Sequence, residues 1–214
     1  MQNALVLVTG GARSGKSRFA QGMAQTLGGR VVFIATAEAR DGEMAQRIEA
    51  HRASRPPSWE TVESPLGLAA AIRSCRGRAE VVLVDCLGVF VSNLLCAKTG
   101  AMSTDDDPVL PDGLAGAIEA EAAQAIAAAR EIPAAAILVT NEAGAGLVPP
   151  YAAGRLFRDV LGRVNQAAAA AADRVYLVQC GLAVELKSLS LTPAEACAGL
   201  RGADRAAGGG GEGA

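Results

Sequence analysis

The segment GGARSGKS, residues 10–17, has the residue types and the spacing of a phosphate-binding loop. The pattern G-x-x-x-x-G-K-[ST] (Walker A) is met at Gly10, Gly15, Lys16 and Ser17. Glycines let successive backbone N–H groups turn toward an anion, and the N-terminus of a following helix adds its dipole. We expect Lys16 to contact the β- and γ-phosphates of a nucleoside triphosphate and the Ser17 hydroxyl to ligate Mg²⁺.

A second candidate metal ligand is Asp85, at the end of the apolar run VVLVDC. A P-loop enzyme needs a carboxylate at the end of a neighbouring strand, where it orients the metal ion. Asp85 follows four apolar residues and meets this requirement, although an acid that only caps a strand would show the same pattern. Ser17 and Asp85 are therefore the expected metal ligands, and the two motifs together indicate an enzyme that uses Mg²⁺ and a nucleoside triphosphate.

A regulatory GTPase is a less favoured interpretation of the same motifs. DCLG at 85–88 fits the pattern D-x-x-G, which is short and arises often by chance. Such GTPases recognise guanine through N-K-x-D, whereas TNEAG at 140–144 has glutamate where lysine should stand. A nucleotide-binding module without catalytic activity, which regulates a partner, is a further alternative.

His51 is the one histidine in the chain of 214 residues, and it lies in the arginine-rich segment RIEAHRASRP. A lone histidine on a helix is most often a solvated surface residue. Arg52 and Arg55 flank it and are candidates to neutralise phosphate charge, but arginines on a solvated helix face would look the same.

Strand-like and helix-like segments alternate along the chain and must position these residues. Apolar runs predict buried strands at 4–10, 30–37, 80–88 and 134–144, with a short strand after the loop at 56–63. Helical spacing predicts helices at 16–27, 41–54 (with Asp41 as N-cap), 65–75, 114–130 and 154–172. The segment 174–187 predicts a hairpin that turns near Gly181. We therefore expect one α/β domain over residues 1–190, with a mostly parallel sheet flanked by helices and a C-terminal antiparallel hairpin.

Composition limits the class of protein. Only 3% of residues are aromatic and the net charge is -2, so nothing favours nucleic-acid binding. Residues 1–80 nevertheless carry 11 basic against 7 acidic residues, which suits a polyphosphate ligand. Five cysteines without C-x-x-C spacing favour a reducing cytoplasm over a zinc site or disulfides, and no apolar run is long enough to span a bilayer.

Two segments carry no functional signal. Residues 99–113 are polar and rich in turn formers, which predicts a surface loop. Residues 202–214 are rich in glycine, offer no apolar face to bury, and are predicted to be disordered.

Several segments together resemble one family closely. They are VTGGARSGKS, FIATAEARDGEMAQRIEAHRASRP, TNEAGAGLVP and FRDVLGRVNQAAAAAADRVYLV, and the likeness runs from about residue 4 to 187. The sequence resembles the bifunctional adenosylcobinamide kinases/adenosylcobinamide-phosphate guanylyltransferases of cobalamin biosynthesis. The resemblance implies a RecA-like P-loop fold and a homotrimer with the corrinoid between subunits.

The resemblance implies two reactions at one nucleotide site. ATP or GTP first phosphorylates the aminopropanol hydroxyl of adenosylcobinamide, and GTP then donates GMP to that phosphate with release of pyrophosphate. The family's nucleophilic histidine, which carries GMP as an intermediate, falls on His51. A neutral imidazole suits this role because it is nucleophilic near pH 7 and brings no negative charge toward a phosphate. A kinase without the guanylyltransferase activity, in which Lys16 and Asp85 matter and His51 does not, stays an alternative.

The other site residues follow from the same resemblance, beside the catalytic pair His51 and Lys16. The implied GTP contacts come from the phosphate loop, the end of the second strand, the run after the histidine and two acids: Gly10, Gly11, Ala12, Arg13, Ser14, Gly15, Lys16, Ser17, Ala35, Thr36, Ala37, Arg52, Ala53, Ser54, Arg55, Glu63 and Asp85. Asn141 and Glu142 either close the pocket or form a turn. For Asp159, Arg163 and Asn165 the sequence favours packing or subunit contacts over chemistry.

Overall fold

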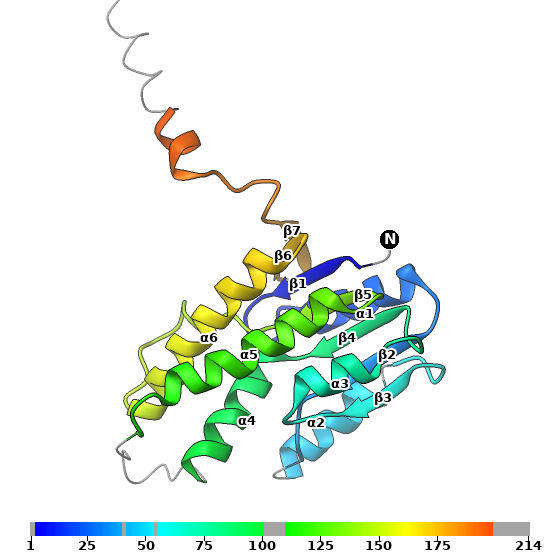
Figure 1. Cartoon of the computed structure of the whole chain (residues 1–214), viewed down its shortest axis with the longest axis horizontal. Helices are drawn as coiled ribbons and strands as arrows, with labels where there is room; N and C mark the ends of the chain where they lie inside the picture. The colour runs from blue at the N-terminus through cyan, green and yellow to red at the C-terminus, as the bar shows by residue number, and fades with distance from the viewer. Residues whose placement is uncertain (1–2, 40–41, 54, 101–109, 199–214) are drawn as a thin grey trace, which may run out of the picture.

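The computed structural model describes residues 3–39, 42–53, 55–100 and 110–198 (Figure 1). Three predictions lie outside these residues: the helix cap at Asp41, the GTP contact at Ser54, and the disordered tail at 202–214. Most of the predicted surface loop at 99–113 also lies outside them. Within the described ranges, no helix is long and apolar enough to cross a membrane.

The described strands form one seven-stranded sheet with the order β3-β2-β4-β5-β1-β6-β7. The strands are β1 (Leu5–Thr9), β2 (Val31–Ala35), β3 (Glu60–Glu63), β4 (Val81–Asp85), β5 (Ala135–Val139), β6 (Arg174–Gln179) and β7 (Leu182–Glu185). Strands β1 to β6 pair in parallel, and β7 pairs with β6 in antiparallel orientation. The predicted parallel sheet and C-terminal hairpin are therefore confirmed.

Helices cover both faces of this sheet. They are α1 (Lys16–Leu27), α2 (Gly42–Ala53), α3 (Leu68–Ser74), α4 (Leu87–Thr99), α5 (Leu114–Glu131) and α6 (Ala152–Ala171). Figure 1 shows α3, α5 and α6 in front of the sheet and α1 behind it. Along β1, Leu5 and Leu7 pack with α3 to α6, whereas Val6 and Val8 pack on the face that α1 covers. Successive residues of a strand point to opposite faces, so a buried parallel strand is apolar throughout.

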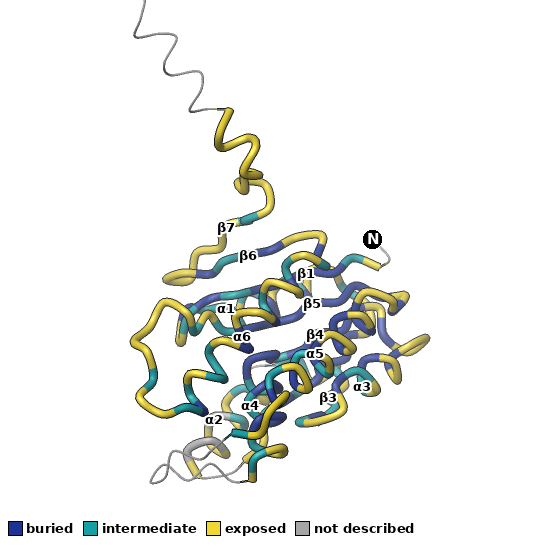
Figure 2. The backbone as a smooth tube through the Cα atoms, turned by 60° about the vertical axis from the view of Figure 1, so that its left-hand side comes forward, coloured by how far each residue is buried: buried dark blue, intermediate teal, exposed yellow. Residues whose placement is uncertain are grey.

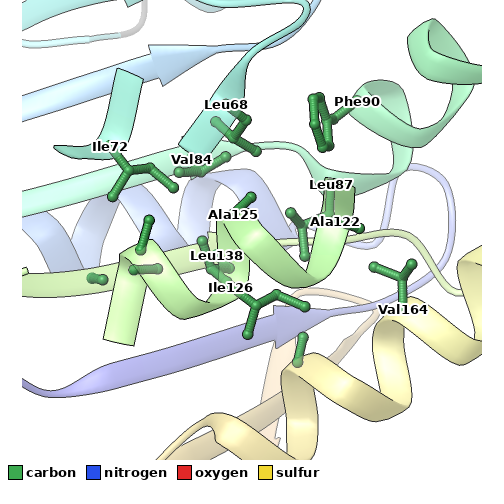
Figure 3. Packing of buried hydrophobic residues seen from close by; sticks show 14 of the residues in the cluster. Leu68, Ile72, Val84, Leu87, Phe90, Ala122, Ala125, Ile126, Leu138 and Val164 are labelled. Carbon is green, nitrogen blue, oxygen red and sulfur yellow. The ribbon is translucent and has the colours of Figure 1, made fainter. Parts of the chain in front are cut away.

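The larger part of the core lies between the sheet and α3, α4, α5 and α6 (Figures 2 and 3). Leu68 of α3, Val84 of β4 and Leu87 and Phe90 of α4 are almost completely buried there. At about 25 cal/mol per Å² of apolar surface, each such leucine or phenylalanine contributes roughly 2 kcal/mol on burial. This packing fixes the ends of the strands, which is where the motifs lie.

Two predicted strands end earlier than the apolar pattern indicates. The strand predicted at 80–88 stops at Asp85, and Leu87 opens α4, a helix that the sequence analysis did not predict. Helix α4 is apolar on most of its surface because it is buried among other helices, so it lacks the polar stripe that reveals a helix. The strand predicted at 134–144 likewise stops at Val139, since the chain leaves the sheet there.

The pairing register brings the ends of four strands into one row. Ala35 of β2 pairs with both Glu63 of β3 and Asp85 of β4, and Asp85 pairs with Val139 of β5. Strand β1 ends at the same edge and continues into the P-loop. Residues far apart in the sequence thus meet at the carboxyl edge of a parallel sheet, where α/β proteins bind ligands.

A buried polar cluster of Thr36, Cys86 and Asn93 ties these strand ends together. The Thr36 hydroxyl accepts a hydrogen bond from Cys86 N (2.8 Å) and donates one to Cys86 O (2.9 Å). Asn93 Nδ2 donates to Thr36 O (2.7 Å) and to Pro65 O (3.1 Å), and Asn93 is only 5% exposed. The cluster therefore links the segments that follow β2, β3 and β4.

Asn93→Leu should destabilise the fold. Leucine has a similar size but donates no hydrogen bonds, so the carbonyls of Thr36 and Pro65 lose a buried partner. We expect the free energy of unfolding to fall by about 2–4 kcal/mol, as measured by urea denaturation. Ser92→Ala on the same helix is the control and should change the midpoint little; an Asn93→Leu midpoint equal to the control's would contradict the role assigned to the cluster.

Candidate active site

The P-loop, residues 10–17, has a backbone that only glycine accommodates at two points. Gly10 has φ 157°, and a Cβ atom there would lie 2.4 Å from the carbonyl oxygen of Val178. Gly15 has φ 97°, and its Cβ would lie 3.3 Å from Cα of Gly181. The loop thus passes close to β6 and to the turn of the β6–β7 hairpin, which larger residues would prevent.

The hairpin turn also holds the P-loop through a hydrogen bond. Gly181 N donates to Ser14 O (2.8 Å). Across the loop, Lys16 Nζ donates to Gly11 O (3.2 Å), so the ammonium group already lies over the cradle. The loop is therefore preorganised to bind phosphate groups, with the dipole of α1 directed at them.

Asp85 places a buried carboxylate beside this cradle. Burial raises the pKa of Asp85, while a hydrogen bond from Ser17 and the charges of His51, Lys16 and Arg55 act in the opposite direction. Its Oδ2 atom is buried and has no hydrogen-bond partner. A group of this kind accepts a cation readily, because a cation offsets the cost of burying the charge.

These atoms fit the predicted Mg²⁺ site. The orphaned Oδ2 of Asp85 and the Ser17 hydroxyl are hard oxygen ligands, which Mg²⁺ prefers. Among the described residues, no group of three or more His, Cys, Asp or Glu side chains surrounds a common point. That sparse ligand set suits Mg²⁺, which takes most of its ligands from water and substrate phosphates.

His51 lies in the last turn of α2, opposite the P-loop, and is partly buried. It lines two adjoining cavities, and Lys16 and Ser17 line both of them as well. The imidazole therefore borders the phosphate cradle from the helix side, close enough to Asp85 for their charges to interact. The sequence left open that His51 is a solvated surface residue. Its partial burial in the wall of two cavities differs from that alternative.

Arg55 fixes the end of α2 against the sheet. Its Nε donates to His51 O (3.1 Å) and its Nη1 to Thr61 Oγ1 (3.0 Å), and its Cζ lies 3.9 Å from the ring centroid of Phe33. Burial lowers the pKa of Arg55, and the charge of Arg52 lowers it further. These contacts favour a supporting role for Arg55 over the phosphate neutralisation that the sequence suggested.

We call the smaller of the two cavities the inner pocket and the larger one the outer groove. The inner pocket, of about 200 Å³, is lined by Lys16, Ser17, Phe33, Ala35, Ala37, Ile48, His51, Arg52, Arg55, Thr61, Glu63, Asp85, Cys86, Val89 and Asn141. The outer groove, of about 920 Å³, is lined by Arg13, Ser14, Gly15, Lys16, Ser17, Arg18, Gln21, Gln46, Ala50 and His51. Lys16, Ser17 and His51 form the boundary between the two.

Most of the predicted site residues line one of these cavities. Ala35, Ala37, Arg52, Arg55, Glu63 and Asp85 line the inner pocket, and Arg13, Ser14 and Gly15 line the outer groove. Thr36 lines neither, because it is 0% exposed and bonded to Cys86. Ala53 is exposed at the end of α2 and also lines neither cavity, while Gly10, Gly11 and Ala12 form the rest of the loop without lining either one.

Sequence reasoning missed several residues of the site. Phe33, Ile48, Thr61 and Val89 contribute walls of the inner pocket. Their apolar or small side chains look like ordinary core residues, so only the pairing of Phe33 with Thr61 and the packing of α2 and α4 reveal that they face the pocket. Arg18, one residue past the P-loop motif, was detectable as a cation on the first turn of α1.

The segment after β5 is held by α6. Asn165 Oδ1 accepts from the Thr140 hydroxyl (2.6 Å), and Asn165 Nδ2 donates to Asn141 O (2.9 Å). Asn141 lines the inner pocket, whereas Glu142 accepts a hydrogen bond from Gly144 N (2.7 Å) within a turn. Arg163 forms an ion pair with Glu119 of α5 (2.6 Å), a packing contact between two helices.

Comparison with known proteins identifies the family. Residues 6–186 match the family model described as cobinamide kinase/cobinamide phosphate guanyltransferase. The chain belongs to this family. It is 46% identical to the bifunctional adenosylcobalamin biosynthesis protein CobU of Escherichia coli, over 86% of this chain and 99% of that protein. It is 44% identical to CobP of Pseudomonas aeruginosa, over 85% of this chain and 96% of that protein.

A solved structure gives the fold independently. An ATPase from the type III secretion system of pathogenic bacteria aligns with 92% of this chain and 61% of its own, with a TM-score of 0.53 and 11% sequence identity. The likeness at this identity concerns the fold alone. Together with the sheet order, it confirms the predicted α/β P-loop fold with a RecA-like, mostly parallel sheet.

The substitution Asp85→Asn should preserve the stability of the fold and weaken the activity that depends on Mg²⁺. Because the pKa of Asp85 is raised in the folded state, ionising this group costs folding free energy at every pH above its unfolded value near 3.8. At neutral pH and without Mg²⁺, we therefore expect the melting temperature of the variant to equal or exceed that of the wild type.

Turnover that depends on Mg²⁺ should fall in the same variant by about tenfold or more, because asparagine lacks the charge that orients the metal. Thermal unfolding and a magnesium titration of turnover check the two expectations. A melting temperature of the variant several degrees below that of the wild type would contradict the conclusion that ionised Asp85 destabilises the fold. Unchanged rates across the titration would assign the metal to another carboxylate, with Glu63 the next candidate.

Proposed function

We propose that this protein phosphorylates adenosylcobinamide with ATP or GTP and then transfers GMP from GTP to adenosylcobinamide phosphate. The products are adenosylcobinamide-GDP and pyrophosphate, and GMP is carried on His51 between the two halves of the transfer. Membership of the family supports both activities. The observation that carries the proposal is the position of His51 in the wall shared by both cavities, beside Lys16 and Ser17.

In the kinase reaction, the aminopropanol hydroxyl of adenosylcobinamide attacks the γ-phosphorus. A new O–P bond forms, the bond from γ-phosphorus to the bridging oxygen breaks, the nucleoside diphosphate leaves, and the hydroxyl proton passes to water. Lys16 and the amides of the P-loop stabilise the charge that develops on the phosphate oxygens.

In the guanylyl transfer, an imidazole nitrogen of His51 attacks the α-phosphorus of GTP. An N–P bond forms and pyrophosphate leaves toward the P-loop, where Lys16 offsets its charge. A phosphate oxygen of adenosylcobinamide phosphate then attacks the same phosphorus, forms the P–O–P bond and frees the imidazole. The hydrogen bond from Arg55 to His51 O holds this part of α2 in place during both steps.

Mg²⁺, held by Ser17 and Asp85, would neutralise phosphate charge in both reactions. Support for this assignment comes from the orphaned Oδ2 of Asp85 and its contact with Ser17.

A homotrimer and a cytoplasmic location remain predictions from the sequence. Exposed apolar side chains, such as Leu147 (97% exposed) after β5 and Leu182 on β7, offer surfaces that subunit contacts would cover.

Lys16→Ala should remove both activities, because both reactions need the triphosphate in one cradle. We expect each rate to fall by about 10²-fold or more, measured separately as phosphorylation of adenosylcobinamide and as GMP transfer. Lys98→Ala, which removes a partly exposed ion pair with Glu121 and lines neither cavity, is the control. Full retention of either activity would mean a second nucleotide site.

His51→Ala should lose GMP transfer but keep part of the kinase activity, since the hydroxyl attacks the γ-phosphorus directly. The wild type should take label from GTP labelled at the α-phosphate and not at the γ-phosphate, and the adduct should be labile to acid and stable to alkali. Glu49→Ala, an exposed change on the same helix, should behave as the wild type. A His51→Ala protein that still forms the adduct would refute the assignment.

A further inference from the structure

The two cavities that meet at His51 differ in size and in chemistry. The inner pocket has apolar walls and charged groups of both signs, with the carboxylates of Glu63 and Asp85 facing the cations of Lys16, Arg52 and Arg55. The outer groove is more than four times larger, and its described lining contains Arg13, Arg18, Gln21 and Gln46 but no acidic side chain. The groove therefore suits a bulky ligand that carries a phosphate group, whereas the inner pocket suits a compact one.

In-line displacement at phosphorus decides which substrate enters from which side. When His51 attacks the α-phosphorus, pyrophosphate leaves on the side opposite the imidazole, where the P-loop lies. The second attack displaces the imidazole and must also come from the side opposite to it. The phosphate of the acceptor must therefore occupy the place that pyrophosphate has left, at the mouth of the P-loop.

We propose that the outer groove is the acceptor site, and that the inner pocket holds the nucleoside of GTP. This inference rests on the proposed function. The phosphate monoester of the acceptor lies on the P-loop next to Lys16, and the rest of the acceptor extends along α1 past Arg18 and Gln21. Its corrinoid ring is too large for the inner pocket of about 200 Å³, but the open groove accommodates its phosphate-bearing arm.

Arg18 is the side chain best placed to bind this acceptor phosphate. Its guanidinium lies beside the loop and the hairpin turn, with Nη2 3.5 Å from the point a Cβ of Gly181 would occupy. It forms no ion pair with any residue that the structure describes, so binding an anion breaks no existing ion pair. Ser14, another residue of the groove, has a buried hydroxyl that lacks a hydrogen-bond partner.

The same groove serves the kinase reaction. With the nucleoside in the inner pocket and the P-loop around the β- and γ-phosphates, the γ-phosphate is the end of the triphosphate nearest the groove. The hydroxyl of unphosphorylated adenosylcobinamide reaches it from that side. One acceptor site thus presents first a hydroxyl to the γ-phosphorus and later a phosphate to the GMP carried on His51.

The two halves of the GMP transfer can be measured separately to test this inference. The protein is first loaded with GMP from α-labelled GTP without acceptor, freed of nucleotide, and then mixed with adenosylcobinamide phosphate. In Arg18→Ala, loading should proceed at close to the wild-type rate, while the acceptor concentration for half-maximal release of label should rise about tenfold or more. Arg18→Lys should recover part of the loss, and Arg76→Ala, which changes an exposed arginine in the turn after α3, should match the wild type.

Two outcomes would overturn the inference. An increase in the KM for GTP during loading, with an unchanged acceptor requirement, would show that the groove holds the nucleotide. Unchanged constants for both substrates would show that Arg18 binds neither. If the wild type forms no GMP adduct, the role proposed for His51 is wrong. The KM for adenosylcobinamide in the kinase reaction then tests the groove independently. A higher KM in Arg18→Ala than in the wild type supports the acceptor site, and an unchanged KM refutes it.

Discussion

A carboxylate buried at the end of an apolar strand is the feature around which this site is built. Ionised Asp85 is costly in that position, as its raised pKa and orphaned Oδ2 indicate. Positive and hydrogen-bonding groups from three different elements compensate for it: Lys16 and Ser17 from α1, His51 from α2, and Arg55 after α2. Lys16, Ser17 and His51 are also the groups that the proposed reactions of a triphosphate and its metal ion require. One arrangement thus stabilises the buried carboxylate and supplies the groups that the proposed chemistry needs.

The sheet makes this arrangement possible because its register brings separate strand ends together. Ala35 pairs with Glu63 and Asp85, so two acidic side chains 22 residues apart in the sequence border one pocket. The cluster of Thr36, Cys86 and Asn93 keeps these ends in place from behind. The P-loop receives comparable support from the hairpin turn at Gly181. The reacting groups therefore lie on rigid elements, and α2 is held to them by the contacts of Arg55.

Much of this site could be predicted from the sequence, because its motifs consist of residue types that phosphate and metal binding require at fixed spacing. The P-loop, the boundaries of α1 and the strand position of Asp85 follow from local patterns, and the structure agrees with them. Helix α4 escaped prediction because burial on nearly every side removes the amphipathic signal. The hydrogen bonds of Thr36 and Arg55 also escaped prediction, since their partners lie 50 and 6 residues away and only the tertiary fold brings them near. The division into two cavities has no local sequence signal at all.

In the proposed mechanism, the imidazole of His51 carries GMP at the boundary of these two cavities. Peptide mapping by mass spectrometry of the protein after incubation with Mg²⁺ and GTP tests it most directly. His51 is the one histidine in the chain. We therefore predict a GMP mass increment on the peptide that contains His51, with fragment ions that place the GMP on the histidine. A GMP increment on Lys16, Ser17 or any other residue, or an unmodified protein under conditions of active GMP transfer, would contradict it.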